Sequence, residues 1–100
     1  MVHHIVTWKL KASFSAQERE KALAFLMEKV ETLKKIPGVA DFETTTRINP
    51  KTTIPADFIL HSSHETQDAL KEYYDHPVHL EFVAAVKGII DFRELLDFEI

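Results

Sequence analysis

Apolar residues alternate with other residues at the start of the chain and then change to a helical spacing. Residues 2–11 alternate, which predicts a strand. One face of that strand carries His4, Val6, Trp8 and Leu10. From Ser15 the apolar residues recur every three or four positions, which predicts a helix with one apolar stripe. Ser15 and Glu18 form a capping-box pattern at its start, and Pro37-Gly38 is expected to end it.

The rest of the chain predicts further strands and helical segments. The strands cover residues 39–48, 57–63 and 89–100. Thr66 is expected to cap a second helix, which is interrupted at His76-Pro77. Pro77 then opens a third helical segment that Gly88 closes. The order is therefore βαββα(α)β, within a single domain over residues 1–100.

This order predicts an α+β fold of the ferredoxin-like type, in which the helices cover one face of an antiparallel sheet. The predicted strands carry apolar or uncharged residues on both faces. A sheet with water on one side alternates apolar and charged residues more cleanly. We therefore expect two copies to pack sheet against sheet around a two-fold axis. The alternative is a monomer whose outer sheet face is mildly apolar.

Composition and charge exclude several classes of function. The chain has 100 residues and no cysteine, which excludes a disulfide scaffold or a thiol enzyme. Its net charge is −4 and its lysines and arginines form no stripe, so nucleic acid is not an expected partner. No segment has the roughly 18 apolar residues of a membrane span. No basic segment precedes a long apolar core at the N-terminus, so we expect a cytoplasmic protein without a secretory signal.

The candidate chemistry is carried by histidines and tyrosines. His79 lies on the apolar stripe of the last helical segment, where an imidazole with a pKa of about 6.5 can abstract a proton next to a carbonyl. Alternatively, it is a core histidine bonded to the backbone or to Tyr73. Tyr73 is expected to direct its hydroxyl into a cavity, and Tyr74 to pack or to reach water. His4 shares a strand face with Val6 and Trp8.

The spacing of the other histidines does not favour a metal site. His61 and His64 are three apart on or just beyond a predicted strand, so they face opposite ways. His76 and His79 straddle a helix start, and no carboxylate is placed to complete a ligand shell. His76 is better interpreted as a helix cap or surface residue. No phosphate-binding loop, nucleophile elbow or paired-carboxylate spacing is present, so we expect no metal and no cofactor.

Several short segments taken together carry a resemblance to a known family. They are HIVTWKLK at residues 4–11, IPGV at 36–39, YYDHPVH at 73–79 and LDFE at 96–99. The HP-x-H element preceded by tyrosine is the most specific of them. From His4 to Phe98 the chain resembles the stress-responsive A/B barrel family, also called Dabb domains. That resemblance implies a dimeric α/β barrel.

One plant branch of this family consists of polyketide cyclases, which close a linear poly-β-keto substrate into an aromatic ring without metal or cofactor. For such an activity the resemblance implies that His79 is the general base, that Tyr73 holds a substrate oxygen and that His4 lines the pocket. A further pocket histidine of the cyclases falls on Phe58 here, which makes the cavity more apolar. The wider superfamily also includes monooxygenases of antibiotic biosynthesis, which use the electrons of the aromatic substrate.

We therefore predict a homodimer with a small, mostly apolar cavity in each subunit, between the sheet and the helices. The expected border of the cavity is His4, Trp8, Phe58, Tyr73 and His79. Such a cavity is expected to bind a small apolar or aromatic ligand. The alternatives are a cyclase-like enzyme with His79 as base and Tyr73 as carbonyl polariser, or a monooxygenase-like enzyme.

Overall fold

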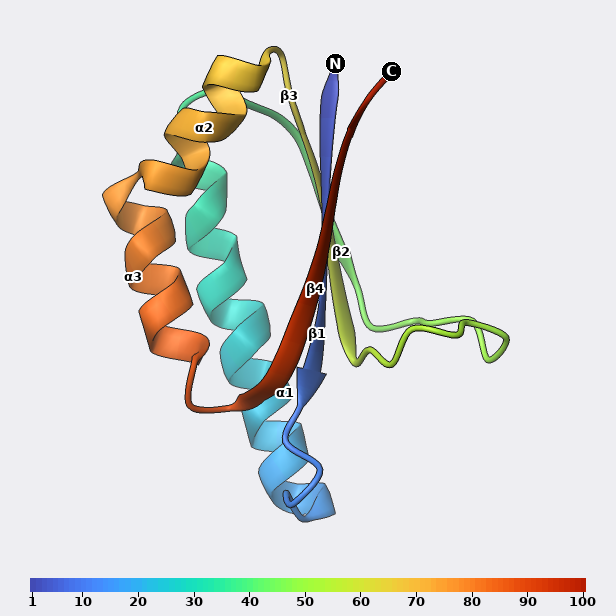
Figure 1. Ribbon diagram of the computed structural model, residues 1–100. Coiled ribbons are helices and arrows are strands. Elements are labelled where there is room, and N and C mark those ends of the chain that lie inside the picture. The colour runs from blue at the N-terminus through green and yellow to red at the C-terminus, as the bar shows by residue number, and fades with distance from the viewer.

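The computed structural model describes all residues from 1 to 100 and has the predicted ferredoxin-like architecture (Figure 1). The strands are β1 (Val2–Leu10), β2 (Val39–Thr45), β3 (Phe58–His64) and β4 (Ile90–Glu99). They form one antiparallel sheet in the order β2-β3-β1-β4. The helices are α1 (Ala16–Val30), α2 (Gln67–Asp75) and α3 (Pro77–Val86). All of them lie on the same side of the sheet, which leaves its other face open.

The ends of the elements follow local chemistry. Ser15 and Glu18 form the predicted capping box at the start of α1. The His76 side chain accepts a hydrogen bond from the backbone N–H of Val78. Of the two roles predicted for His76, helix cap and surface residue, the structure shows the helix cap. Helix α1 ends at Val30, sooner than predicted, because residues 31–35 tighten into a 3₁₀ helix.

The second strand is shorter than predicted and ends at Thr45. Residues 46–57 leave the sheet as a long loop that projects on the side away from the helices (Figure 1). Pro50 and Pro55 have no backbone N–H, so this segment cannot continue the pairing with β3.

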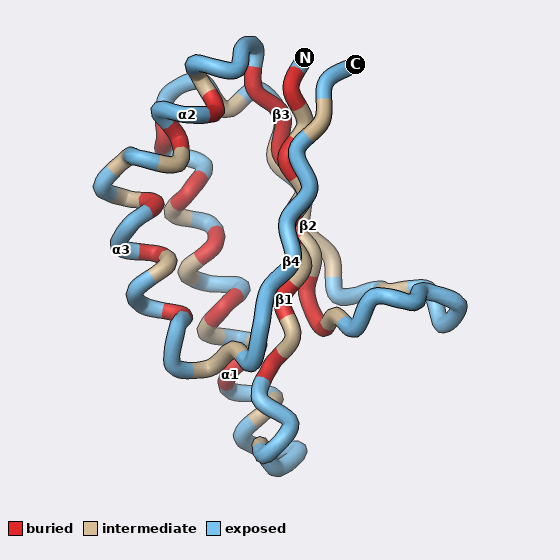
Figure 2. The backbone as a smooth tube through the Cα atoms, viewed as in Figure 1, coloured by how far each residue is buried: buried red, intermediate tan, exposed pale blue.

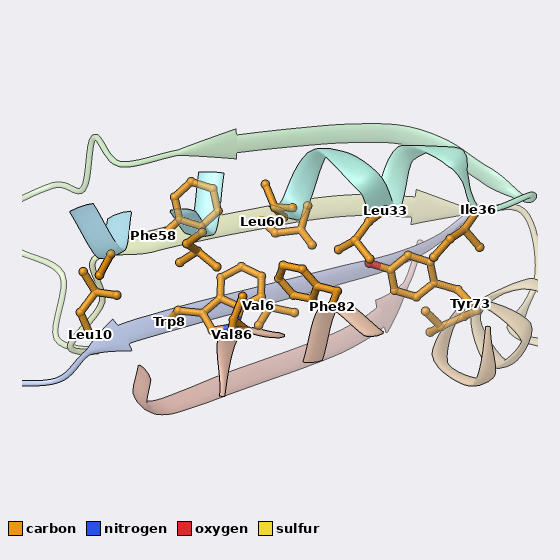
Figure 3. Close-up of a cluster of buried hydrophobic side chains, with 14 of the residues drawn as sticks. Val6, Trp8, Leu10, Leu33, Ile36, Phe58, Leu60, Tyr73, Phe82 and Val86 are labelled. Atoms are coloured by element: carbon orange, nitrogen blue, oxygen red, sulfur yellow. The ribbon is translucent and has the colours of Figure 1, made fainter. Parts of the chain in front are cut away.

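The core lies between the sheet and the helices (Figure 2). β1 buries the predicted face and keeps the intervening residues half-buried. The side chains that fill the layer include Val6, Trp8, Leu33, Phe58, Leu60, Tyr73, Phe82 and Val86 (Figure 3). No helix is long and apolar enough to cross a membrane.

Asp57, just before β3, ties one end of the sheet to α1. Its carboxylate accepts a hydrogen bond from the Leu10 N–H at 2.8 Å and pairs with Arg19 and Lys9. Burial raises the pKa of Asp57, but these hydrogen bonds and positive charges outweigh it and hold the pKa below its usual value. This pairing fixes the end of the sheet beside Trp8.

The open face of the sheet carries apolar side chains, as the two-sided pattern predicts. Ile5 of β1 is paired with Leu96 of β4, which is 60% exposed. At one end of this face, the His3 ring stacks on Phe98 at 5.1 Å and is hydrogen-bonded to His61 at 2.9 Å. The helices of the same chain cannot cover these residues, because they lie on the other side of the sheet.

Candidate functional site

Three of the predicted site residues come together where α2 meets α3 over the sheet. His4 is supplied by β1, Tyr73 by α2 and His79 by α3. The Tyr73 ring lies 5.6 Å from the His4 ring and 4.9 Å from the His79 ring, centroid to centroid. The Pro77 start of α3 creates the sharp turn that brings His79 back towards Tyr73.

A hydrogen-bonded network joins His4 to the last strand. His4 Nδ1 lies 2.6 Å from Asp97 Oδ1, and the Tyr74 hydroxyl donates to Asp97 Oδ2, also at 2.6 Å. The Tyr74 oxygen is itself 3.1 Å from His4 Nδ1. Since a carboxylate only accepts, Nδ1 carries the proton and donates it to Asp97. Nε2 of the neutral His4 imidazole is then an acceptor.

The His4 contact is a hydrogen bond of a neutral imidazole rather than an ion pair at neutral pH. Burial lowers the pKa of His4, and the hydrogen bond and charge of Asp97 oppose it only in part. Burial and the Asp97 contact raise the pKa of Tyr74, so its hydroxyl stays a donor. We expected Tyr74 to pack or to reach water, but its hydroxyl instead donates a hydrogen bond to the Asp97 carboxylate.

His79 is held as a neutral base. Its Nδ1 lies 3.0 Å from the backbone oxygen of Tyr74, so Nδ1 carries the proton and Nε2 the lone pair. Burial lowers the pKa of His79, and nearby positive charge lowers it further. The hydrogen bond to the Tyr74 carbonyl raises the pKa but does not cancel these effects. A bond to the backbone is what the core-histidine alternative predicts, and it leaves the Nε2 lone pair without a protein partner.

The Tyr73 hydroxyl is buried and has no hydrogen-bond partner. It points into the layer between sheet and helices, near Leu33 (Figure 3). Burial alone raises the pKa of Tyr73, so the hydroxyl is protonated and able to donate. An unpaired buried hydroxyl costs free energy, which a ligand or a water can recover.

Replacing Tyr73 by Phe is expected to raise the free energy of unfolding of the ligand-free protein by up to about 1 kcal/mol, because it removes an unpaired buried hydroxyl. Urea denaturation at a fixed protein concentration measures the change. The matched control is Tyr74→Phe, which removes the donor to Asp97 and should lower stability by about 1–2 kcal/mol. Destabilisation by Tyr73→Phe would indicate that the hydroxyl is paired after all.

The predicted cavity is divided in the structure. The hollow next to His4, Tyr73 and His79 has a volume of about 10 Å³, enough for one water at most. Beside it, between α3 and β4, lies an open groove of about 430 Å³. The hollow and the groove share Trp8, Phe82, Val83 and Arg93. The two spaces therefore lie side by side, separated by these shared side chains, with His4, Tyr73 and His79 on the hollow and a mostly apolar lining on the groove.

Phe58 is not part of this site. It packs behind Trp8, with 5.7 Å between ring centroids, and lines neither the groove nor the hollow. The reason is the strand order, which puts β3 on the opposite side of β1 from β4. The groove opens beside β4, so a β3 side chain at the level of Trp8 cannot reach it.

The comparisons with known proteins identify the family. The family model of the Stress responsive A/B Barrel Domain, or Dabb, matches residues 2–100. The chain belongs to the Dabb family. A stress-response A/B barrel domain-containing protein of Arabidopsis thaliana is 29% identical over 97 residues, which are 97% of this chain and 84% of the relative.

Two solved structures are similar over almost the whole of this Dabb domain. One is a dimeric protein of unknown function with a ferredoxin-like fold from Bacteroides fragilis, with 26% identity and a TM-score of 0.83. The other is a Dabb family protein with a ferredoxin-like fold from Mesorhizobium loti, with 26% identity and a TM-score of 0.77. Each match covers 99% of this chain and 95% of the neighbour.

Sequence reasoning missed three residues that the Dabb fold brings to the site: Asp97, Arg93 and His64. Asp97 and Arg93 lie on the same face of β4, towards the helix side, and both are exposed; their neighbours depend on the pairing with β1. His64 faces the helices with its ring 4.9 Å from Tyr73, and His61 faces the open side, as the spacing predicts. No group of three or more histidine and acidic side chains is arranged to hold a metal ion.

Proposed function

We propose that this Dabb domain is a homodimer that binds a small apolar or aromatic ligand in the groove between α3 and β4. The observation that carries the proposal is the groove itself, whose walls include Trp8, Phe82 and Val86 and which shares part of its wall with the small hollow beside His4 and His79. Ligand sites typically have volumes of about 300–1,000 Å³, mostly apolar walls and a few polar groups. The groove has this character.

The open sheet face supports the homodimer. Ile5, Leu96 and the loop residue Ile54 border a hollow of about 630 Å³ on this face. Ile54 is 50% exposed at the base of the projecting loop. An exposed apolar surface of this kind marks a protein interface, and a two-fold axis is the most common way to cover it. The Bacteroides neighbour, which has the same fold, is described as dimeric.

The ligand-binding proposal is tested with a neutral aromatic probe, 2-naphthol, by isothermal titration calorimetry. Val83→Trp fills the groove and is expected to weaken binding by about tenfold or more, a change of about 1.4 kcal/mol or more. The matched control is Leu80→Trp, which adds the same ring to the outer surface of α3, where Leu80 is 57% exposed. Equal affinity in the wild type and both variants would place the probe outside the groove.

The two neutral imidazoles favour a second candidate function, which is cofactor-independent proton abstraction. For a substrate that enters from the groove and displaces the side chains between groove and hollow, His79 Nε2 would take a proton from a carbon between two carbonyls. The unpaired Tyr73 hydroxyl would donate to the enolate oxygen. The Nδ1 bonds of His79 to Tyr74 and of His4 to Asp97 fix the rings for this role.

Deuterium exchange into a β-keto thioester, followed by NMR, tests that chemistry. His79→Gln is expected to abolish exchange while leaving 2-naphthol affinity unchanged within about threefold. Wild-type protein that binds the probe but catalyses no exchange would leave the domain a binding protein. Oxygen consumption with dihydroxy aromatics would instead indicate monooxygenase-like chemistry.

A further inference from the structure

Arg93 lies between the groove and the cluster formed by His4, Tyr73 and His79. It lies on the helix side of β4, opposite Trp8 in the strand pairing, and is exposed to solvent. It is one of the residues that line both the groove and the hollow below it. Burial is the main reason for the low pKa of His79, and the positive charge of Arg93 also contributes. The Arg93 guanidinium is therefore close enough to His79 for its charge to affect the imidazole.

The Arg93 guanidinium has no anionic partner in the protein. None of the ion pairs of the structure includes it. Asp91 also lines the groove, two positions earlier on the same strand, and does not pair with Arg93. With Lys87 the groove lining holds two cations and one carboxylate, although the whole chain carries a net charge of −4. The groove is thus a locally cationic site on an acidic protein.

We infer that the ligand of this groove is an apolar carboxylic acid in its ionised form, whose body packs on Trp8 and Phe82 while its carboxylate pairs with Arg93. The inference rests on the proposed ligand-binding function and specifies its chemical class. A planar guanidinium can bind a carboxylate through two parallel hydrogen bonds, which fixes the orientation of the ligand as well as its charge. The carboxylate would then lie beside Arg93 and the body along α3.

Arg93 suits this role better than Lys87. Lys87 is the C-cap residue of α3, where its ammonium is attracted to the unpaired carbonyls of the helix end. It lines the groove but not the hollow beside His4 and His79. Arg93 is held on a strand that is paired with β1 along its length, so its backbone position is fixed.

The test compares two probes that share a ring system and differ in charge, 2-naphthoate and 2-naphthamide. Wild-type protein is expected to bind naphthoate about tenfold more tightly than naphthamide. In Arg93→Met this preference should disappear, and naphthamide affinity should change by less than about twofold. Arg93→Lys should retain part of the preference, and Lys87→Met, which removes the other groove cation, should reduce it less than Arg93→Met does. Lys51→Met, the matched control in the projecting loop, should retain it in full. Raising the salt concentration from about 0.05 M to about 0.5 M should weaken naphthoate binding only.

The outcomes separate this inference from the proposed function. Equal affinity of wild-type protein for the two probes would overturn the carboxylate inference and leave the groove as a site for neutral ligands. Loss of the preference in Lys87→Met with retention in Arg93→Met would overturn the assignment to Arg93. If naphthoate, naphthamide and 2-naphthol all fail to bind, the proposed ligand-binding function itself is wrong.

Discussion

Leu96→Glu is expected to convert the protein from a dimer to a monomer of 11.5 kDa. Leu96 is 60% exposed on the open sheet face, next to Ile5 of the neighbouring strand. Glu94, two positions earlier on the same face, would add repulsion to the new carboxylate. Burying an unpaired charge in an interface costs several kcal/mol, so the dissociation constant should rise by about a hundredfold or more. Sedimentation equilibrium over a range of concentrations measures it.

Leu80→Glu is the matched control for this experiment. Leu80 is an equally exposed leucine, at 57%, but it lies on α3, on the other side of the molecule from the open sheet face. The control should remain a dimer with an unchanged dissociation constant. A wild-type protein that sediments at 11.5 kDa at micromolar concentration would refute the homodimer. A dimer that survives Leu96→Glu and is lost in Leu80→Glu would move the interface to the helices.

The free energy of unfolding is expected to fall by about 2–3 kcal/mol between pH 7 and pH 4.5, chiefly because of His64. Burial lowers the pKa of His64 to about 4, and the charge of His4 contributes. The unfolded chain returns this pKa to about 6.5. Between these two values the unfolded state binds more protons than the folded state, so stability decreases as the pH falls. Burial also lowers the pKa of His4 and of His79, which adds to the loss.

His64→Phe tests the assignment, because it keeps an aromatic ring against Tyr73 and removes the titrating group. Urea denaturation from pH 7 to pH 4.5, at one fixed protein concentration, should show a flatter pH dependence in this variant. Ser62, which is hydrogen-bonded to His64 Nε2 at 3.0 Å, loses its partner, so a constant offset at every pH is expected. A wild-type slope in His64→Phe would show that another group causes the acid sensitivity.

The chain alone determined the elements and the fold class, because these depend on signals within a few residues. The alternation in residues 2–11 predicts which side of β1 is buried, and the structure confirms it. The capping box at Ser15 and the His76-Pro77 start of α3 are also local, and both are present. The family resemblance also implied that one pocket contains His4, Tyr73 and His79, and the three rings do lie together. That resemblance rests on the short segments 4–11 and 73–79, which contain these residues. The ferredoxin-like order then follows from the sequence of elements.

The tertiary structure alone decided the partners of these residues and the shape of the site. His4 and Asp97 are 93 positions apart and meet only because β1 pairs with β4 in one register. The same pairing sets Arg93 opposite Trp8, and the strand order removes Phe58 from the groove. Hydrophobic periodicity specifies which face of a strand is buried but not which strand lies beside it. Neighbours across the sheet are selected by the packing of the whole chain, since one-sided burial is compatible with many strand orders.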